Sequence, residues 1–155
     1  MPEHILSGVK AIVAMKLRRK GLTQEEIAEL LKCNRSAISH YLTGKYPKEK
    51  VIRVARAIES LSPREGVKII KNLIEDKELI KNLIKNLYDI EIYWDENKCL
   101  FCGSCLICEA ISQEGMKIKI DKDKCWLCLK CLELCPANAL ILKRENYDSA
   151  NKRVF

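Results

Sequence analysis

Cysteine is the residue that most constrains this chain. Eight of its nine cysteines lie between Cys99 and Cys135, and only Cys33 stands apart. The chain has neither the features of a signal peptide nor an apolar run of the roughly 18 residues that a membrane span needs, so we expect a cytoplasmic protein with no membrane partner. In a reducing cytosol, clustered thiols are typical of metal ligands rather than of disulfides.

An internal repeat organises these cysteines. The segment IEIYWDENKCLFCGSC (90–105) aligns with MKIKIDKDKCWLCLKC (116–131) at an offset of 26 residues. Each copy starts with the alternation of apolar residues that is typical of a strand, and it continues into a Cys-x2-Cys-x2-Cys loop. A duplicated unit of one strand and one ligand loop is the simplest explanation.

The second copy ends in a complete motif, C-x2-C-x2-C-x3-C-P, which runs from Cys125 to Pro136. Three thiolates spaced by two residues can bind three corners of one cubane iron–sulfur cluster, while a fourth on the next turn points toward a neighbouring cluster. A zinc site is the alternative. Zinc is usually held by paired C-x2-C knuckles, however, and this spacing fits them poorly.

These motifs resemble those of the bacterial-type two-cluster ferredoxins over residues 90–144, and we assign residues 90–155 to such a domain. The resemblance implies a small α+β fold with pseudo-twofold symmetry, in which the two halves exchange their fourth ligands. It also implies two [4Fe–4S] clusters. The first cluster would be bound by Cys99, Cys102, Cys105 and Cys135, and the second by Cys125, Cys128, Cys131 and Cys108.

The first copy departs from the family motif. Its last two cysteines, Cys105 and Cys108, are separated by two residues instead of three, and Glu109 stands in place of the proline. The alternatives for the second cluster are a strained [4Fe–4S] cluster, a [3Fe–4S] cluster, a cubane with one non-cysteine ligand, and an ordinary cubane on a rearranged loop. We expect this cluster to be the labile one and the cluster closed by Cys135 to be a structural anchor.

Residues 1–61 form a different and basic segment. Apolar residues recur in it at helical spacing, which predicts consecutive short helices. Residues 1–56 contain 12 Lys and Arg against 5 Asp and Glu, so their charge of +7 equals the surplus of the whole chain. A positive segment suits a polyanionic partner such as DNA. Thr23 with Glu26 predicts a capping box, and Asn34 predicts the N-cap of the next helix.

The stretch from Leu22 to Lys45 has the pattern of a helix-turn-helix motif. Ala28 lets the two helices cross closely, and the expected core positions are Ile27, Leu31, Ile38 and Leu42. Over residues 8–58 the chain resembles the Cro/repressor-type helix-turn-helix domains, in the archaeal form in which the motif precedes a separate effector domain. That family usually has a glycine where Lys32 stands and a buried aliphatic residue where Cys33 stands. The predicted contacts with double-stranded DNA come from Gln24, Arg35, Ser36, Ser39, His40, Lys45 and Lys48. A helical bundle that binds no nucleic acid is the alternative.

Residues 62–89 are predicted to be a helical linker. Ser62-Pro63 indicates a helix start with proline at the first helical position. The linker forms either one long helix or two helices broken near Asp76. Its apolar stripe either makes a dimer contact or packs within its own subunit, and it consists of Ile70, Leu73, Ile80, Ile84 and Leu87.

The sequence therefore predicts an all-α helix-turn-helix domain, a helical linker and a small ferredoxin-like α+β domain. The leading hypothesis is a homodimeric DNA-binding transcriptional regulator whose iron–sulfur domain senses redox state, oxygen or cluster supply. The alternative is a ferredoxin-type electron-transfer protein whose helical part docks a redox partner protein. We do not expect an enzyme, because no acid–base pair or nucleophile stands apart from the eight clustered cysteines.

Overall fold

A computed structural model describes residues 2–144 of the chain. It divides the chain into two compact units, Met1–Tyr88, which we call the helical unit, and Asp89–Phe155, which we call the cysteine-rich unit. Residue 1 and residues 145–155, the end of the predicted ferredoxin domain, lie outside the described residues. The functional division into DNA-binding, linker and ferredoxin segments stays a prediction.

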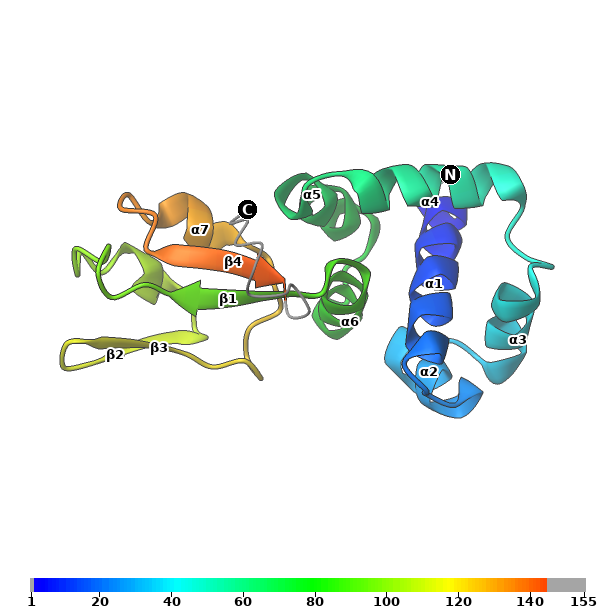
Figure 1. The fold of residues 1–155 in the computed structure, drawn as a ribbon, viewed down its shortest axis with the longest axis horizontal. Helices are drawn as coiled ribbons and strands as arrows, with labels where there is room; N and C mark the ends of the chain where they lie inside the picture. Colours follow the sequence, from blue (N-terminus) through cyan, green and yellow to red (C-terminus); the bar gives the residue numbers. More distant parts are fainter. Residues whose placement is uncertain (1, 145–155) are drawn as a thin grey trace. The chain divides into compact units, whose positions relative to one another are not determined.

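The described part of the helical unit consists of consecutive helices, as the apolar spacing predicts (Figure 1). The first helix packs against each of the other five. Its apolar residues Ala11, Val13 and Ala14 are fully buried, which makes this helix the centre of the unit. The helices are α1 (Pro2–Arg19), α2 (Gln24–Leu31), α3 (Arg35–Thr43), α4 (Glu49–Ser60), α5 (Pro63–Leu73) and α6 (Lys77–Tyr88).

Both predicted helix caps are present. The Glu26 amide donates to Thr23 Oγ1 at 3.3 Å, and the Ala37 amide donates to Asn34 Oδ1 at 2.8 Å. Each bond satisfies a backbone donor that has no partner inside its own helix, so these side chains determine where α2 and α3 begin.

The turn between α2 and α3 adopts the left-handed conformation expected at the usual glycine position. Lys32 occupies it with φ of 50° and ψ of 46°, which is strained for a residue with a Cβ. The Lys32 side chain forms two ion pairs from this position, because its Nζ lies 2.6 Å from Asp76 Oδ2 and 3.3 Å from Glu78 Oε2. Asp76 in turn accepts from the Glu78 and Leu79 amides, so it caps α6 while it pairs with Lys32.

Residues 62–89 form two helices broken before Asp76, which is the second of the two alternatives. Pro63 is the first helical residue of α5, as predicted. The structure does not support the use of the apolar stripe as a dimer contact. Ile70, Ile80 and Ile84 are buried, and α6 packs against α1, α2 and α5 within the helical unit. The predicted homodimer therefore has no assigned face.

Two predictions for the helix-turn-helix core need correction. Tyr41 is buried on α3, with 6% of its surface exposed, whereas Leu42 is only half-buried. Cys33 is also half-buried rather than fully inside, and burial raises the pKa of its thiol. The buried set of the motif is otherwise as predicted at Ile27, Ala28, Leu31 and Ile38.

Tyr88 predicts a loss of stability in alkali. Its buried hydroxyl donates to the Ile58 carbonyl at 2.7 Å, and burial, with a contribution from the charge of Glu59, raises its pKa to about 12. The phenol has a pKa near 10 in the unfolded chain, so the contribution of Tyr88 to the free energy of unfolding is complete below about pH 10. It falls by about 1.4 kcal/mol for each pH unit as the pH rises from about 10 toward 12. Denaturant unfolding between pH 9 and 12 should show this fall, and Tyr88→Phe should flatten it. An equal fall in the variant would contradict the assignment to Tyr88.

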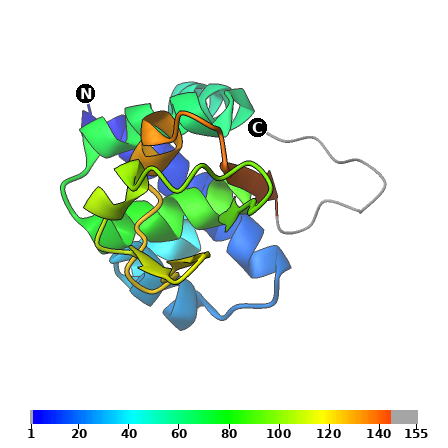
Figure 2. The same ribbon diagram turned by 90° about the vertical axis from the view of Figure 1, so that its left-hand side faces the viewer.

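The cysteine-rich unit contains two antiparallel two-stranded sheets. β1 (Ile90–Trp94) pairs with β4 (Leu140–Arg144), and β2 (Ile111–Glu114) pairs with β3 (Lys117–Ile120) (Figure 1). Within residues 89–144, two short helices, η1 (Ser104–Ile107) and α7 (Lys130–Leu134), accompany the sheets. In Figure 2, the hairpin of β2 and β3 is drawn in yellow and faces the viewer. β1 and β3 are the strands predicted from the repeat, so the sequence duplication is also a duplication of structure.

Candidate functional site

The two ligand loops repeat the same backbone conformation. Phe101 and Leu127, which are 26 residues apart, both have positive φ, at 54° and 57°. Two residues later Gly103 and Leu129 do the same, at 78° and 60°. Such left-handed residues are uncommon outside glycine, and their recurrence at matched positions indicates that both loops are wound for the same ligand.

Matched hydrogen bonds join the two halves. The Asp95 amide donates to the Ala139 carbonyl at 2.7 Å, and the Asp121 amide donates to the Ala110 carbonyl at 2.7 Å. Asp95 and Asp121 are equivalent in the repeat, so Ala110 has the same role as Ala139. Each half therefore closes the ligand loop of the other, which is the topology that ligand exchange requires.

The first cysteine set consists of Cys99, Cys102, Cys105 and Cys135. Burial raises the pKa of the Cys105 thiol, and the charges of Cys135, Cys99 and Cys102 raise it further, so these thiols lie near one another. Cys102 is exposed, and its hydrogen bonds with Ser104 lower the pKa of its thiol. The set takes its fourth member from the other half.

The second cysteine set consists of Cys125, Cys128, Cys131 and Cys108. Burial raises the pKa of the Cys131 thiol to about 12, and the charges of Cys125, Cys128 and Cys108 add to the rise. Cys131 is 6% exposed, which makes it the one buried cysteine among those the structure describes. The second set is thus the more enclosed of the two, and it also takes its fourth member from the other half.

The shorter turn before Cys108 is accommodated by tighter winding. Cys131 and Cys135 are joined by an i→i+4 bond of 3.1 Å in α7, while Cys105 and Cys108 are joined by an i→i+3 bond of 3.1 Å in η1. A 3₁₀ turn needs one residue fewer than an α turn. Cys108 ends in the same extended conformation as Cys135, with φ of −75° against −80°. This geometry favours ordinary ligation on a rearranged loop over the other three alternatives.

The two sets have the donor chemistry of cubane clusters. Four thiols per set match the ligands of [4Fe–4S] clusters, and each thiolate binds a different iron atom. A single ion would instead draw its ligands onto one point. Within residues 2–144, no three side chains of His, Cys, Asp or Glu gather closely enough to hold one ion.

The surface predicted to contact DNA is mostly accessible in the helical unit. Arg35, Ser36 and His40 are exposed on α3, and so are Lys45 and Lys48 after it. Gln24 and Ser39 are half-buried, which limits their reach. The Arg35 guanidinium lies 3.5 Å from Glu25 Oε1, so binding of a base edge would have to break this exposed ion pair.

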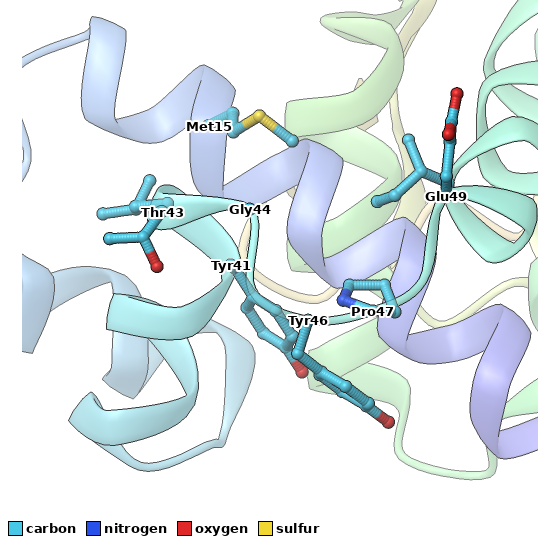
Figure 3. A pocket seen from close by; sticks show the side chains of 9 residues that line it. Met15, Tyr41, Thr43, Gly44, Tyr46, Pro47 and Glu49 are labelled. Carbon is cyan, nitrogen blue, oxygen red and sulfur yellow. The ribbon is translucent and has the colours of Figure 1, made fainter.

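A hollow of about 380 Å³ lies beside the C-terminal end of α3 (Figure 3). The rings of Tyr41 and Tyr46 lie nearly parallel at its edge, with centroids 6.1 Å apart. Leu42 lines the hollow, which explains why this residue is only half-buried. None of the predicted DNA contacts lines it, but Lys45 and Lys48 are the chain neighbours of residues that do, so the hollow adjoins that surface.

The fold and the two cysteine sets define a ferredoxin-type iron–sulfur protein with a helix-turn-helix region. A family described as a 4Fe-4S binding domain matches residues 118–141, and one described as a helix-turn-helix domain matches residues 15–61. Neither description specifies a repressor of the Cro type. No helix within the described residues is long and apolar enough to cross a membrane.

The chain belongs to the family of the ferredoxin-type protein FwdE. It is 57% identical over 145 residues to FwdE of Methanocaldococcus jannaschii, an alignment that covers 94% of this chain and 99% of that protein. It is also similar to the pyruvate synthase subunit PorD of the same organism, with 36% identity over 83 residues, which are 51% of this chain and 96% of PorD. No solved structure matches. A ferredoxin-type relative agrees with the prediction that the chain is not an enzyme.

Trp94 was not identified from the sequence as a site residue. It lies at the end of β1, where its ring meets Phe101 of the first ligand loop at 6.1 Å between centroids. The repeat contained a signal, because the equivalent position in the second copy is Ile120. A polar aromatic side chain in only one of two matched positions distinguishes the two loops.

Proposed function

We propose that the chain is a ferredoxin-type electron carrier that holds one [4Fe–4S] cluster in each cysteine set. The observation that carries the proposal is the pair of Cys-x2-Cys-x2-Cys loops with matched backbone conformation, which the Asp95–Ala139 and Asp121–Ala110 hydrogen bonds link across the two halves. Membership of the FwdE family supports the same function.

The residues of the chain bind and shield the two clusters, and each cluster when bound can take up or release an electron. Backbone amides stabilise the ligand sulfurs, since the Phe101 amide donates to Cys99 Sγ at 3.4 Å and the Ala139 amide donates to Cys135 Sγ at 3.3 Å. Hydrogen bonds to the ligand sulfurs are among the features by which a protein tunes the reduction potential of an iron–sulfur cluster. Exposed Cys102 offers a short path from the first set to a partner.

The proposal predicts about eight irons and eight acid-labile sulfides per chain after anaerobic purification, because each of the two cubanes contains about four irons and four sulfides. Iron and sulfide quantitation with electron paramagnetic resonance of the reduced protein would measure this. Stoichiometric zinc without labile sulfide would overturn the proposal. Four irons with a single signal would limit it to one cluster.

The helical unit is then proposed to dock a redox partner protein. The similarity to PorD, whose name describes a pyruvate synthase subunit, supports an association of this chain with an enzyme. Pull-down of the full chain from anaerobic extract, compared with a variant that lacks the helical unit, tests the docking. The cytoplasmic location remains a prediction that accompanies this function.

A DNA-binding regulator is the second candidate function. It is supported by the helix-turn-helix match over residues 15–61 and by the exposed Arg35, Ser36 and His40 on α3. In this function, cluster loss or a change of redox state would alter DNA affinity, so whichever cluster is lost first in air is the expected sensor. Gel-shift binding of holo and apo protein to the upstream DNA of its own gene, at a stated salt concentration, separates the two functions.

If the chain binds a specific operator, Arg35→Ala should weaken that complex by about 1–3 kcal/mol, because an arginine at this position can bind a guanine edge with two hydrogen bonds. Lys48→Ala is the matched control, and it should weaken specific and random DNA alike and reduce the salt dependence. Equal losses on both DNAs for Arg35→Ala would argue against base recognition. No binding by the wild type would leave electron transfer as the function.

A further inference from the structure

Trp94 carries the clearest unsatisfied group of the cysteine-rich unit. Its indole Nε1 is buried and has no hydrogen-bond partner, which is true of no other buried side-chain nitrogen or oxygen in the part of the chain that the structure describes. Leaving a buried donor unpaired costs free energy, because the group loses its bond to water and gains none in return. Such a cost is avoided if the site receives an acceptor that the polypeptide itself does not supply.

The surroundings of Trp94 belong to the first cysteine set. Its ring meets the Phe101 ring edge-on, with an interplanar angle of 73°. Phe101 lies between Cys99 and Cys102, and its amide donates to Cys99 Sγ at 3.4 Å. Trp94 therefore packs directly against the ligand loop of this set.

The neighbour of Trp94 on strand β4 follows the segment that contains Cys135, the proposed fourth ligand of the same set. Trp94 is the partner of Leu140 in the β1–β4 ladder. The residue before Leu140 is Ala139, whose amide donates to Cys135 Sγ at 3.3 Å. Both chain segments that supply the first set are thus neighbours of Trp94, one through its ring and the other through the ladder.

The strand directs the indole inward. Side chains alternate along β1, so Trp94 shares a face with Ile90 and Ile92, which are 1% and 7% exposed, while Tyr93 lies on the other face and is 39% exposed. Trp94 as a whole is half-buried, and its buried Nε1 lies on the same face of β1 as these two core residues.

We propose that Trp94 Nε1–H donates a hydrogen bond to a sulfur of the cluster held by the first cysteine set, and that this bond raises the reduction potential of that cluster. Reduction makes the cluster more negative, and a donor to its sulfur stabilises the more negative state. Ile120, the equivalent residue of the second copy, has no donor, so the two clusters differ in potential. The inference rests on the two clusters of the proposed function.

Redox titration of Trp94→Phe, followed by electron paramagnetic resonance, tests the proposal. One of the two midpoint potentials should become more negative by about 59 mV. This shift corresponds to about a tenfold change in the equilibrium constant of the one-electron reduction. The other midpoint should not move. Trp126→Phe, the only other tryptophan, is the matched control in the second loop, and it should leave the Trp94-sensitive midpoint unchanged.

A second measurement does not depend on the stability of the Trp94 variant. Trp126→Phe protein labelled with ¹⁵N at the indole should show, by pulsed electron paramagnetic resonance, a ¹⁵N coupling to one reduced cluster. Absence of the coupling, or two unchanged midpoints in Trp94→Phe, would overturn the inference. The proposed function would still stand if the wild type showed two reversible midpoints. A wild type without reducible clusters would overturn both.

Discussion

Cys108→Ser and Cys135→Ser are each expected to halve the iron content, from about eight to about four irons per chain, and to remove different clusters. The two residues end the matched helices η1 and α7 in the same backbone conformation. In the proposed function, Cys135 completes the first cysteine set and Cys108 completes the second. A serine hydroxyl is a much weaker iron ligand than a thiolate, so each variant should retain only the cluster of the other set.

The two variants should differ in stability, in the order opposite to that expected from the sequence. The shorter turn suggested a labile cluster at Cys108, but the second set encloses Cys131, which is 6% exposed, whereas Cys102 of the first set is exposed. Loss of the enclosed cluster uncovers more apolar surface. We therefore expect Cys108→Ser to lower the unfolding temperature of the cysteine-rich unit more than Cys135→Ser, and air to attack the first cluster first.

Anaerobic iron analysis and thermal unfolding followed by circular dichroism measure these differences. Cys33→Ser is the control, because Cys33 lies in the helical unit and its loss should leave all irons in place. A Cys108→Ser protein that kept both clusters would show that Cys108 is no ligand. The reverse order of stability would restore the earlier expectation that Cys135 anchors the domain.

The cysteine-rich unit was largely predictable because its cysteines stand in short sequence motifs. The 26-residue offset predicted β1, β3 and two equivalent loops, and both loops have the same positive φ values. The winding of the turn before Cys108 was not predictable, because the number of residues between two cysteines does not determine which backbone hydrogen bonds the turn makes. The role of Trp94 was missed because an orphaned indole donor is defined by its neighbours in space and not by its sequence.

The helical unit was predictable in its elements and less so in its packing. Caps at Thr23 and Asn34 act within one turn of helix, so the sequence defined them. The stripe of α5 and α6 presented the same apolar face for a dimer or for its own subunit, and only the fold shows that it packs against α1 and α2. The pair of Lys32 with Asp76 spans 44 residues and gave no local signal.

Gly66→Ala is expected to destabilise the helical unit by about 2–4 kcal/mol, although alanine is the better helix former. Gly66 lies within α5, and a Cβ at this position would overlap the hydroxyl and ring of Tyr88 at the end of α6. Tyr88 is 3% exposed and its hydroxyl is bonded to the Ile58 carbonyl at 2.7 Å. Because Tyr88 is buried and its hydroxyl is bonded, we expect the substitution to separate α5 from α6 or to break this buried bond.

Denaturant unfolding of the helical unit by circular dichroism measures the loss, with Lys68→Ala at an exposed position of the same helix as the control. Lys68→Ala should change stability by less than about 0.5 kcal/mol. The double variant Gly66→Ala with Tyr88→Leu separates the clash from a general effect of the substitution. If the clash is the cause, the two changes should couple strongly, and the double variant should be more stable than the sum of the single losses implies. Additive losses, or a gain for Gly66→Ala alone, would mean that α5 and α6 do not approach closely at Gly66.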